Sequence, residues 1–391
     1  MRRLTAIALA LLFSLPCIEA AEELPLQAWI DEAIAAGGGV VTVPPGEHIL
    51  RKGLIIKDAK KISVRGVERE TCILRLPPVT VGKVAKPVPA GGRSVEVLAA
   101  RGWQAGMQVQ FETSGELDSF TGKPKPHVLG RIASVEEGRL MLQEALTHPI
   151  PEGCLMRDPN APNLIEVRGK CEGVEIANLV LDGGRREGDP AIQGHAQLCA
   201  LLAQGDYDYR RGPTGPQPAG IVLRDCIIEN CFGRGAAFYS CKSPRVERCS
   251  IRDCNDEAID FDHFTPGAVA LGNRIIRCRV GLELNDAESC LLQDNELEHC
   301  GIGINAWRFC RQADFNRRHR LLGNRISDCS GNGIQIAEGT LELMIEDNRI
   351  ADCRRNGISL NGDHHQLRRN RITGCSMKPI AINQGEHRIE P

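Results

Sequence analysis

A six-residue motif recurs along the C-terminal half of this 391-residue chain, and it restricts the fold more than any other feature. One copy reads Asn273-Arg-Ile-Ile-Arg-Cys278, and a later copy reads Asn370-Arg-Ile-Thr-Gly-Cys375. The final cysteines of seven copies stand at positions 231, 254, 278, 300, 329, 353 and 375, so the gaps are 23, 24, 22, 29, 24 and 22 residues. This period is too short for two packed helices, and the alternating β-branched pattern is typical of strands. The repeat therefore predicts a β solenoid with one motif per coil and coils about 4.8 Å apart.

Each motif is followed by a second short apolar strand that starts at a glycine. Examples are Gly281–Leu284, Gly303–Ala306, Gly333–Ile336 and Gly357–Leu360. A leucine-rich repeat would add a leucine framework and a helical segment to each turn, and the copies contain neither. A parallel β-helix fits the pattern better.

The N-terminal segment carries a specific resemblance. Residues 36–46, Ala-Gly-Gly-Gly-Val-Val-Thr-Val-Pro-Pro-Gly, resemble the opening strand and turn of right-handed parallel β-helix proteins of the pectin-lyase-like superfamily. Residues 24–36 form an amphipathic pattern, and in that superfamily such a helix covers the open end of the coils. A solenoid needs such a cap. The resemblance covers residues 22–76 and 163–391.

Residues 77–162 interrupt the period and are bounded by prolines. Between them lie four strand-like runs: Ser94–Leu98, Gln108–Glu112, Arg131–Val135 and Arg139–Leu142. We therefore expect an all-β chain: a right-handed parallel β-helix solenoid with an N-terminal capping helix and an inserted small antiparallel β domain. The expected parts are a signal peptide (1–20), the cap and first coils (22–76), the inserted domain (77–162) and the main β-helix (163–391). Two shorter insertions, 185–218 and 308–320, also leave the repeat.

The first twenty residues have the pattern of an export signal. Arg2 and Arg3 precede the apolar run Leu4–Leu15, and Ala20 offers a cleavage site. The sequence thus predicts a secreted or periplasmic protein without a membrane anchor once the signal is removed. A net charge of −2 argues against a nucleic-acid partner.

The seven cysteines of the repeat are expected to form one buried column of unbridged thiols. Stacked side chains on neighbouring coils point the same way, which is a poor geometry for disulfides. Asn273, Asn295, Asn324, Asn348 and Asn370 should form a parallel ladder whose amides bond the neighbouring coils and turns.

The interior of a β-helix is filled, so its chemistry must lie on outer faces or loops. Because side chains alternate between the two faces of a strand, the aligned repeats show which positions face outward. The outward columns are small or neutral at their ends, but in the middle coils they become acidic, aromatic and basic. The predicted catalytic residues are Asp260, Asp262, His263, Glu283, Asp286 and Arg308.

Asp260 and Glu283 should be about 5 Å apart on neighbouring strands. Two carboxylates this close raise one pKa, which provides an acid and a base at neutral pH. Alternatively, a hard cation such as Ca²⁺ could bind Asp260, Glu283 and Asp262. Solvated acidic residues on an outer face are the simplest reading of any single carboxylate.

The resemblance implies three reactions: glycosidic hydrolysis, β-elimination of uronates and uronate epimerisation. Mannuronan epimerases carry Asp-Pro-His near this strand, whereas Asp262 and His263 are adjacent. We expect a monomeric enzyme that cleaves an acidic polysaccharide by β-elimination or hydrolysis; an epimerase and a non-catalytic carbohydrate-binding β-helix are the alternatives. The predicted substrate-binding residues are Asn285, Asn305, Trp307, Tyr239, Tyr207, Tyr209 and Arg211.

Overall fold

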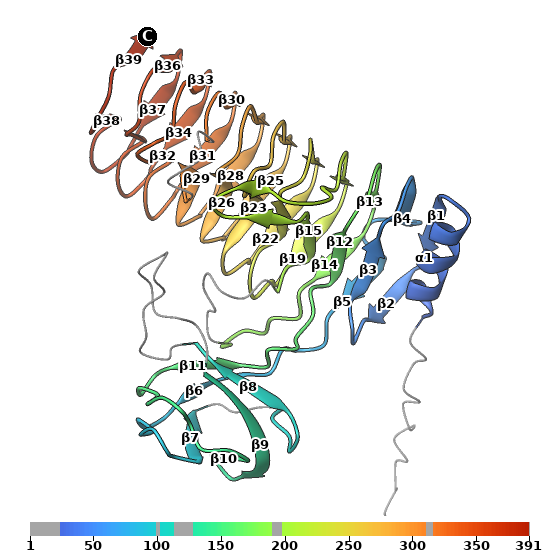
Figure 1. Ribbon diagram of the computed structural model, residues 1–391. Coiled ribbons are helices and arrows are strands. Elements are labelled where there is room, and N and C mark those ends of the chain that lie inside the picture. The colour runs from blue at the N-terminus through green and yellow to red at the C-terminus, as the bar shows by residue number, and fades with distance from the viewer. Residues whose placement is uncertain (1–23, 99–101, 113–127, 190–197, 310–315, 391) are drawn as a thin grey trace, which may run out of the picture.

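Three long parallel β-sheets wind around one axis in the computed structural model, which describes residues 24–98, 102–112, 128–189, 198–309 and 316–390 (Figure 1). Successive strands of the chain pass from one sheet to the next, so each coil adds one strand to every sheet. The predicted right-handed parallel β-helix is confirmed.

The first sheet has eleven strands. They are β1 (Gly39–Val43), β4 (Ile62–Gly66), β13 (Glu175–Ala177), β18 (Val222–Arg224), β21 (Arg245–Glu247), β24 (Val269–Leu271), β27 (Leu291–Gln293), β30 (Arg320–Leu322), β33 (Met344–Glu346), β36 (His365–Arg368) and β39 (His387–Glu390).

The second sheet has ten strands. They are β2 (Gly46–Ile49), β5 (Cys72–Arg75), β14 (Val180–Asp182), β19 (Ile227–Glu229), β22 (Ser250–Arg252), β25 (Arg274–Ile276), β28 (Glu296–Glu298), β31 (Arg325–Ser327), β34 (Arg349–Ala351) and β37 (Arg371–Thr373).

The third sheet, called the site sheet below, also has ten strands. They are β3 (Leu54–Lys57), β12 (Ile165–Arg168), β15 (Leu201–Gln204), β20 (Ala236–Tyr239), β23 (Glu257–Asp262), β26 (Val280–Asn285), β29 (Ile302–Trp307), β32 (Ile334–Ile336), β35 (Ile358–Leu360) and β38 (Ile380–Ile382).

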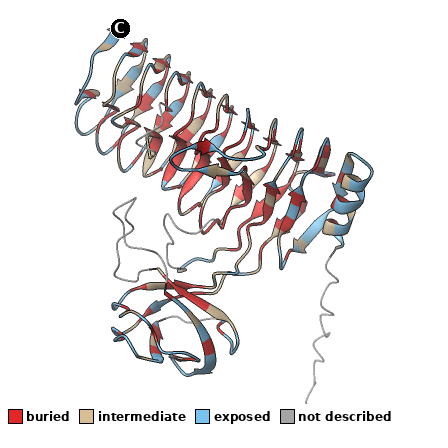
Figure 2. Cartoon of the chain, viewed as in Figure 1, coloured by how far each residue is buried: buried red, intermediate tan, exposed pale blue. Residues whose placement is uncertain are grey.

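The coil interior holds one continuous apolar core, seen as the buried faces of the stack in Figure 2. Six cysteines of the predicted column are buried, from Cys231 to Cys353, and the described cysteines are all unbridged. Cys375 is half-buried because it lies in the coil at the C-terminal end of the stack. The column therefore fills the core with small side chains rather than covalent bonds.

The predicted asparagine ladder is confirmed as well. Asn273 donates from Nδ2 to Oδ1 of Asn295 at 2.9 Å, and Asn295 donates in the same way to Asn324 at 3.0 Å. Each amide also bonds a backbone carbonyl, as Asn295 does with Ala270 at 3.0 Å. Because these groups are buried, the ladder satisfies polar atoms that the turns would otherwise leave unpaired.

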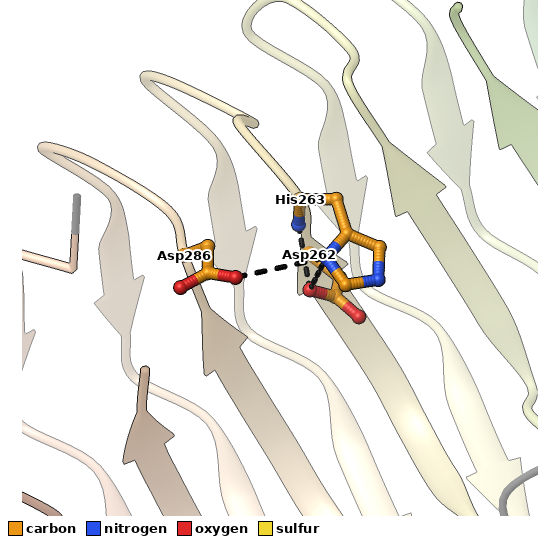
Figure 3. Close-up of side chains that lie close together, drawn as sticks. All are labelled: Asp262, His263 and Asp286. Atoms are coloured by element: carbon orange, nitrogen blue, oxygen red, sulfur yellow. Dashed lines mark hydrogen bonds and ion pairs between the residues drawn. The ribbon is translucent and has the colours of Figure 1, made fainter. Parts of the chain in front are cut away.

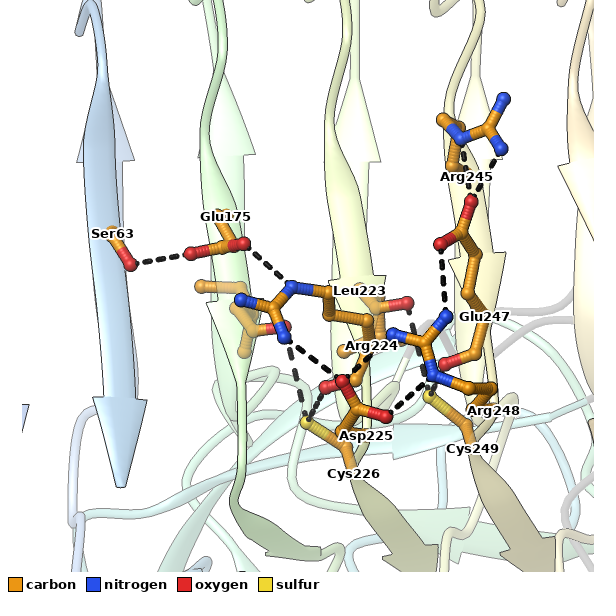
Figure 4. A network of polar contacts seen from close by, with 11 residues as sticks. Ser63, Glu175, Leu223, Arg224, Asp225, Cys226, Arg245, Glu247, Arg248 and Cys249 are labelled. Carbon is orange, nitrogen blue, oxygen red and sulfur yellow. Dashed lines mark hydrogen bonds and ion pairs between the residues drawn. The ribbon is translucent and has the colours of Figure 1, made fainter. Parts of the chain in front are cut away.

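Charged side chains link neighbouring coils on the outside of the first sheet and its following turn (Figure 4). Arg224 donates from Nε to Glu175 at 2.7 Å, and Glu175 accepts from Ser63 at 2.7 Å. Arg248 binds Asp225 one coil further along. These ion pairs are partly exposed, in contrast to the ion pairs of the site sheet, which involve buried carboxylates.

Helix α1 (Leu26–Ala35) covers the N-terminal end of the stack and buries Leu26 and Ile30 against it. The predicted cap is thus present. Among the described residues, no helix is long and apolar enough to cross a bilayer. The predicted signal peptide (1–20) lies outside the described residues.

The segment between β5 and β12 leaves the stack and forms a closed antiparallel barrel, drawn below the coils in Figure 1. Its strands are β6 (Val81–Val84), β7 (Ser94–Leu98), β8 (Gln108–Phe111), β9 (Val128–Glu136), β10 (Arg139–Leu142) and β11 (Leu155–Arg157). The barrel has its own apolar core around Phe111 and Trp103. It confirms the inserted β domain, and it contains two more strands than the sequence predicted. A separate hairpin, β16 (Tyr207–Asp208) and β17 (Gly212–Pro213), lies between β15 and β18 in the chain and packs Tyr207 against the site sheet.

Candidate functional site

The outward positions of the site sheet align as the repeat predicted. Asp260 of β23 pairs in register with Glu283 of β26, and Glu283 pairs with Asn305 of β29. Tyr239 pairs with Asp262, and Asn285 with Trp307. Since parallel strands keep one register, these side chains form two adjacent rows on one face.

These outward rows are buried rather than solvated. Asp260 and Asp286 are 0% exposed, Asp262 and Glu283 are 4% exposed, and His263 is 7% exposed. Rings from elsewhere in the chain cover His263: the centroids of Tyr207 and Tyr209 lie 5.0 Å from it, and that of Phe309 lies 5.7 Å from it. Burial of this many ionisable groups on an outer face requires internal partners.

Two arginines are partners of these buried ionisable groups. Arg234 lies in the turn before β20, and its Nε is 2.7 Å from Glu257 and 2.8 Å from Asp260. Arg279, in the turn before β26, binds Asp256 and Glu257. Cations thus reach the carboxylates from both neighbouring coils.

The carboxyl groups around the arginines differ in the direction of their pKa shifts. Burial alone would raise the pKa of Asp256, but Arg234 and Arg279 hold that pKa below its ordinary value. Burial raises the pKa of Glu257 and of Asp260, and the Asp262 charge raises the pKa of Asp260 further. The phenol of Tyr239 also donates to Asp260 at 3.3 Å.

Glu283 stands beside this charge cluster in an environment that keeps its proton. Burial and the charge of Asp260 raise the pKa of Glu283 to about 8. Trp307 donates from Nε1 to Glu283 at 2.7 Å, and Asn305 donates from Nδ2 at 3.0 Å; these bonds fix the side chain in place and partly oppose the rise in pKa. A carboxyl group that is fixed in place and protonated at neutral pH is suited to act as a general acid.

Two aspartates lie beside the same ring nitrogen of His263 (Figure 3). Its Nδ1 is 2.9 Å from an oxygen of Asp262 and 3.7 Å from an oxygen of Asp286. The other ring nitrogen, Nε2, is on the side of the ring away from both carboxylates. Carboxylates this close to Nδ1 favour a positive charge on the ring, and Nε2 is the nitrogen that faces away from them.

The same three residues are the group that could hold a metal ion within the described chain. One ligand atom each from Asp262, His263 and Asp286 lies within 4.8 Å of the others. This set differs from the predicted calcium ligands, because Asp260 contacts Arg234 and Glu283 contacts Trp307 and Asn305. An imidazole nitrogen with two carboxylate oxygens suits a transition metal better than Ca²⁺, which prefers oxygen ligands.

The other predicted residues have varied positions. Tyr207 and Tyr209 reach His263 from the hairpin, while Asn285 accepts from the backbone N–H of Phe309 at 3.1 Å. Arg211 is exposed, and its backbone N–H bonds Asp208. Arg308 extends toward the next coil, where a Cβ added to Gly339 would lie 2.6 Å from its Nε.

Sequence reasoning missed Arg234, Arg279, Asp256, Glu257 and Phe309. The missed charges stand at or just before the starts of β20, β23 and β26, where Glu257 pairs in register with Val280. A charged residue at a position held by Val280 and Ile302 in later coils was the available signal. Phe309 gave none, because nothing local indicates that its ring turns back onto His263.

Comparisons with known proteins agree with this architecture. Residues 219–389 match the family model described as "Periplasmic copper-binding protein (NosD)". No curated protein sequence matches the chain.

Among solved structures, a glycoside hydrolase is similar with a TM-score of 0.55 at 10% identity, covering 92% of this chain and 93% of that one. The enzymatically active domain of tailspike protein 2 from bacteriophage CBA120 has the same TM-score and identity; the match covers 93% of this chain and 44% of the tailspike. With the three stacked parallel sheets, these similarities identify the chain as a protein with the right-handed parallel β-helix fold.

Proposed function

We propose that the chain is a carbohydrate-acting enzyme that cleaves a uronate-containing polysaccharide by β-elimination on the site sheet. The observation that carries this proposal is the placement of a base, His263 beside Asp262 and Asp286, and of an acid with a raised pKa, Glu283, on neighbouring coils. The similar glycoside hydrolase and tailspike domain support carbohydrate as the substrate class.

The reaction assigns one role to each group. His263 Nε2 takes the proton from C5 of the uronate, and the electron pair forms a C4=C5 double bond as the C4–O4 bond breaks. Glu283 gives its proton to the leaving O4, so the proton removed at C5 is balanced by the one delivered at O4. The two aspartates stabilise the imidazolium that forms.

Removal of the C5 proton is easier when the uronate carboxylate is neutralised. Arg279 is the best-placed cation, because its side chain is 41% exposed. It also lies in the turn that leads into β26, the strand of Glu283. Arg234 is 12% exposed and is surrounded by carboxylates. We therefore assign the substrate carboxylate to Arg279 rather than to Arg308.

Hydrolysis is the second candidate, supported by the register of Asp260 with Glu283. It is less favoured because it assigns no role to His263 and its two aspartates. Epimerisation would use the same removal of the C5 proton without bond cleavage.

The experiment is a screen of the full chain against polygalacturonate, alginate, hyaluronan and a neutral glucan. Reducing ends, ultraviolet absorbance of the unsaturated uronate and deuterium uptake at C5 are followed together. Elimination raises the first two signals. New ends without absorbance would indicate hydrolysis, and deuterium uptake without new ends would indicate epimerisation. If none of the signals changes with any polymer, the enzymatic proposal is wrong.

A cation at Asp262, His263 and Asp286 is a separate proposal, supported by their geometry and by the copper-binding description of the matching family. Equilibrium dialysis with Cu²⁺, Zn²⁺ and Ca²⁺ tests it, with His263→Ala as the variant that should lose binding. An elimination rate that survives chelation would keep His263 as a proton acceptor rather than a ligand. Export of the chain, expected from residues 1–20, agrees with the periplasmic description of that family.

A further inference from the structure

A hollow of about 510 Å³ opens on the first coils, where the chain leaves β5 for the barrel. Its charged lining comprises four arginines and two acids: Arg51, Arg75, Arg185, Arg186, Glu47 and Asp182. The formal charge of this lining is therefore 4 − 2 = +2. It is a basic surface on a chain whose candidate reaction centre is acidic.

The acidic groups of the hollow are both bound by one arginine. Arg75 contacts Glu47 at 2.6 Å and Asp182 at 2.8 Å. The lining contains three further guanidinium groups besides Arg75. Arg186 is exposed, and Arg185 is half-buried.

The hollow lies along the edge of the solenoid that also carries the ion cluster of Arg234, Asp256 and Arg279, whereas His263 lies at the other end of the site strands. The backbone N–H of Arg185 bonds the carbonyl of Asn230, and its Nη2 reaches the carbonyl of Asp253 at 2.8 Å. Asp253 precedes Asp256 of the ion cluster by three residues. The turns that carry the hollow and the ion cluster stack coil upon coil between the second sheet and the site sheet.

The separation suits a polymer. Strands β5, β14, β19 and β22 are successive neighbours in the second sheet, so three steps of about 4.8 Å place the hollow roughly 15 Å from the coil of Asp260. A chain of several sugar units bound at the reaction centre would extend this far along the turns.

We propose that this hollow is a subsite for the negatively charged sugar units of the polysaccharide, outside the unit that reacts. The inference rests on the proposed function, since it assumes an acidic polymer at the site sheet. The buried carboxylates of the centre offer a polyanion little attraction, whereas guanidinium groups bind carboxylates or sulfates with two parallel hydrogen bonds. The basic hollow would supply the affinity, and the acidic centre the chemistry.

The test measures binding of uronate octamers from polygalacturonate, alginate and hyaluronan to the full chain by calorimetry. The variant is Arg51→Gln with Arg186→Gln, which removes charge without touching the Arg75 pairs. We expect the dissociation constant of the preferred octamer to rise at least about tenfold. A neutral glucan octamer should bind no better to the wild type than to the variant.

The chain provides a matched control. A second hollow, of about 520 Å³, lies on β28, β31, β34 and β37 and contains Arg325, Arg349 and Arg371 with two glutamates. The double variant Arg349→Gln with Arg371→Gln should leave octamer binding within about twofold of the wild type.

Three results would overturn the inference: octamer binding that is unchanged in the Arg51/Arg186 variant, equal weakening in both double variants, or no octamer binding by the wild type. Failure of the proposed function is a different result, because it is read from product formation. A chain that binds uronate octamers through this hollow but forms no product would refute the enzyme and retain the subsite.

Discussion

The coils of β23 and β26 and the coils of β32 and β35 share a backbone and differ in chemistry. Their inward side chains are alike, with Ile259, Leu282, Ile334 and Ile358 all fully buried. At the paired outward position, however, Asp260 and Glu283 are followed by Gln335 and Ser359. The interior maintains the stack, while the outer position is free to change.

A charged side chain at this outer position needs more partners than a neutral one. Gln335 donates to Asn305 at 3.2 Å, a neutral bond between neighbouring coils. Asp260 instead needs Arg234 and Tyr239, and the surrounding carboxyls need Arg279. Charged groups are buried on this face only where turns and loops also supply cations and covering rings.

Replacing His263 should give the largest contrast between the two regions. His263→Ala is expected to lower the elimination rate by about 10²–10⁴-fold, because the proton acceptor is lost. Ser359→Ala, at an outward position of a neutral coil, should leave the rate unchanged. Steady-state kinetics on the preferred polymer measure both variants, and equal losses would show that the distinction between the regions is false.

Removing Arg234 tests the charge cluster itself. Arg234→Ala should lower the free energy of unfolding by about 3–5 kcal/mol, because it leaves buried carboxylates without their cation. Arg277, which binds Asp253 on the exposed side, is the control; Arg277→Ala should cost less than about 1 kcal/mol. Urea denaturation gives both values. A small loss for Arg234→Ala would mean that the cluster carries less charge than its contacts suggest.

The C-terminal coils should show their own sensitivity, to acid. Burial lowers the pKa of His319 to about 3 and that of His365 to about 4, both below the ordinary value of 6.5. The unfolded chain therefore binds protons that the folded chain excludes, and stability falls as the pH drops from about 6.5 toward 4. At pH 5 each histidine should cost about 2 kcal/mol.

Unfolding midpoints between pH 7 and pH 5 measure this loss. His319→Asn should reduce the dependence of stability on pH, whereas substituting the exposed His364 with Gln should not. If the slope is the same in both variants, the acid sensitivity originates elsewhere.

The smallest expected effect concerns the proton on Glu283. Because the pKa of Glu283 is raised to about 8, its acid form is present at neutral pH and is lost as the pH rises through that value. The rate should be roughly tenfold lower one pH unit above the pKa. Glu283→Gln should remove this alkaline limb together with most of the activity. An alkaline limb that persists in Glu283→Gln would assign the acid to another group.

The sequence predicted the order of these side chains because repetition and alternation are local properties. Once Gly281 and Gly303 are aligned, strand geometry determines that Glu283 and Asn305 are neighbours. The same regularity explains why the cysteine column and the asparagine ladder could be read directly from the motif.

Burial of the site could not be predicted in this way. Tyr207, Tyr209 and Phe309 come from segments without the repeat, and their contacts with His263 depend on how those segments fold back. Arg234 and Arg279 lie in turns, where alternation no longer tells which way a side chain points. The two missed barrel strands, β6 and β11, are short, and pairing with each other defines them better than their composition does.

That pairing of β6 with β11 has a consequence for how the chain folds. Strand β5 pairs with β14, although the whole inserted barrel lies between them in the sequence. Closing a long loop costs conformational entropy that grows with its length. Within the barrel, Val81 lies opposite Arg157, so the two ends of the insertion are already side by side once the barrel has formed. A barrel that folds first thus shortens the loop that the coil stack has to close. It also makes the insertion replaceable: any compact unit whose ends meet could occupy this place without disturbing the coils on either side.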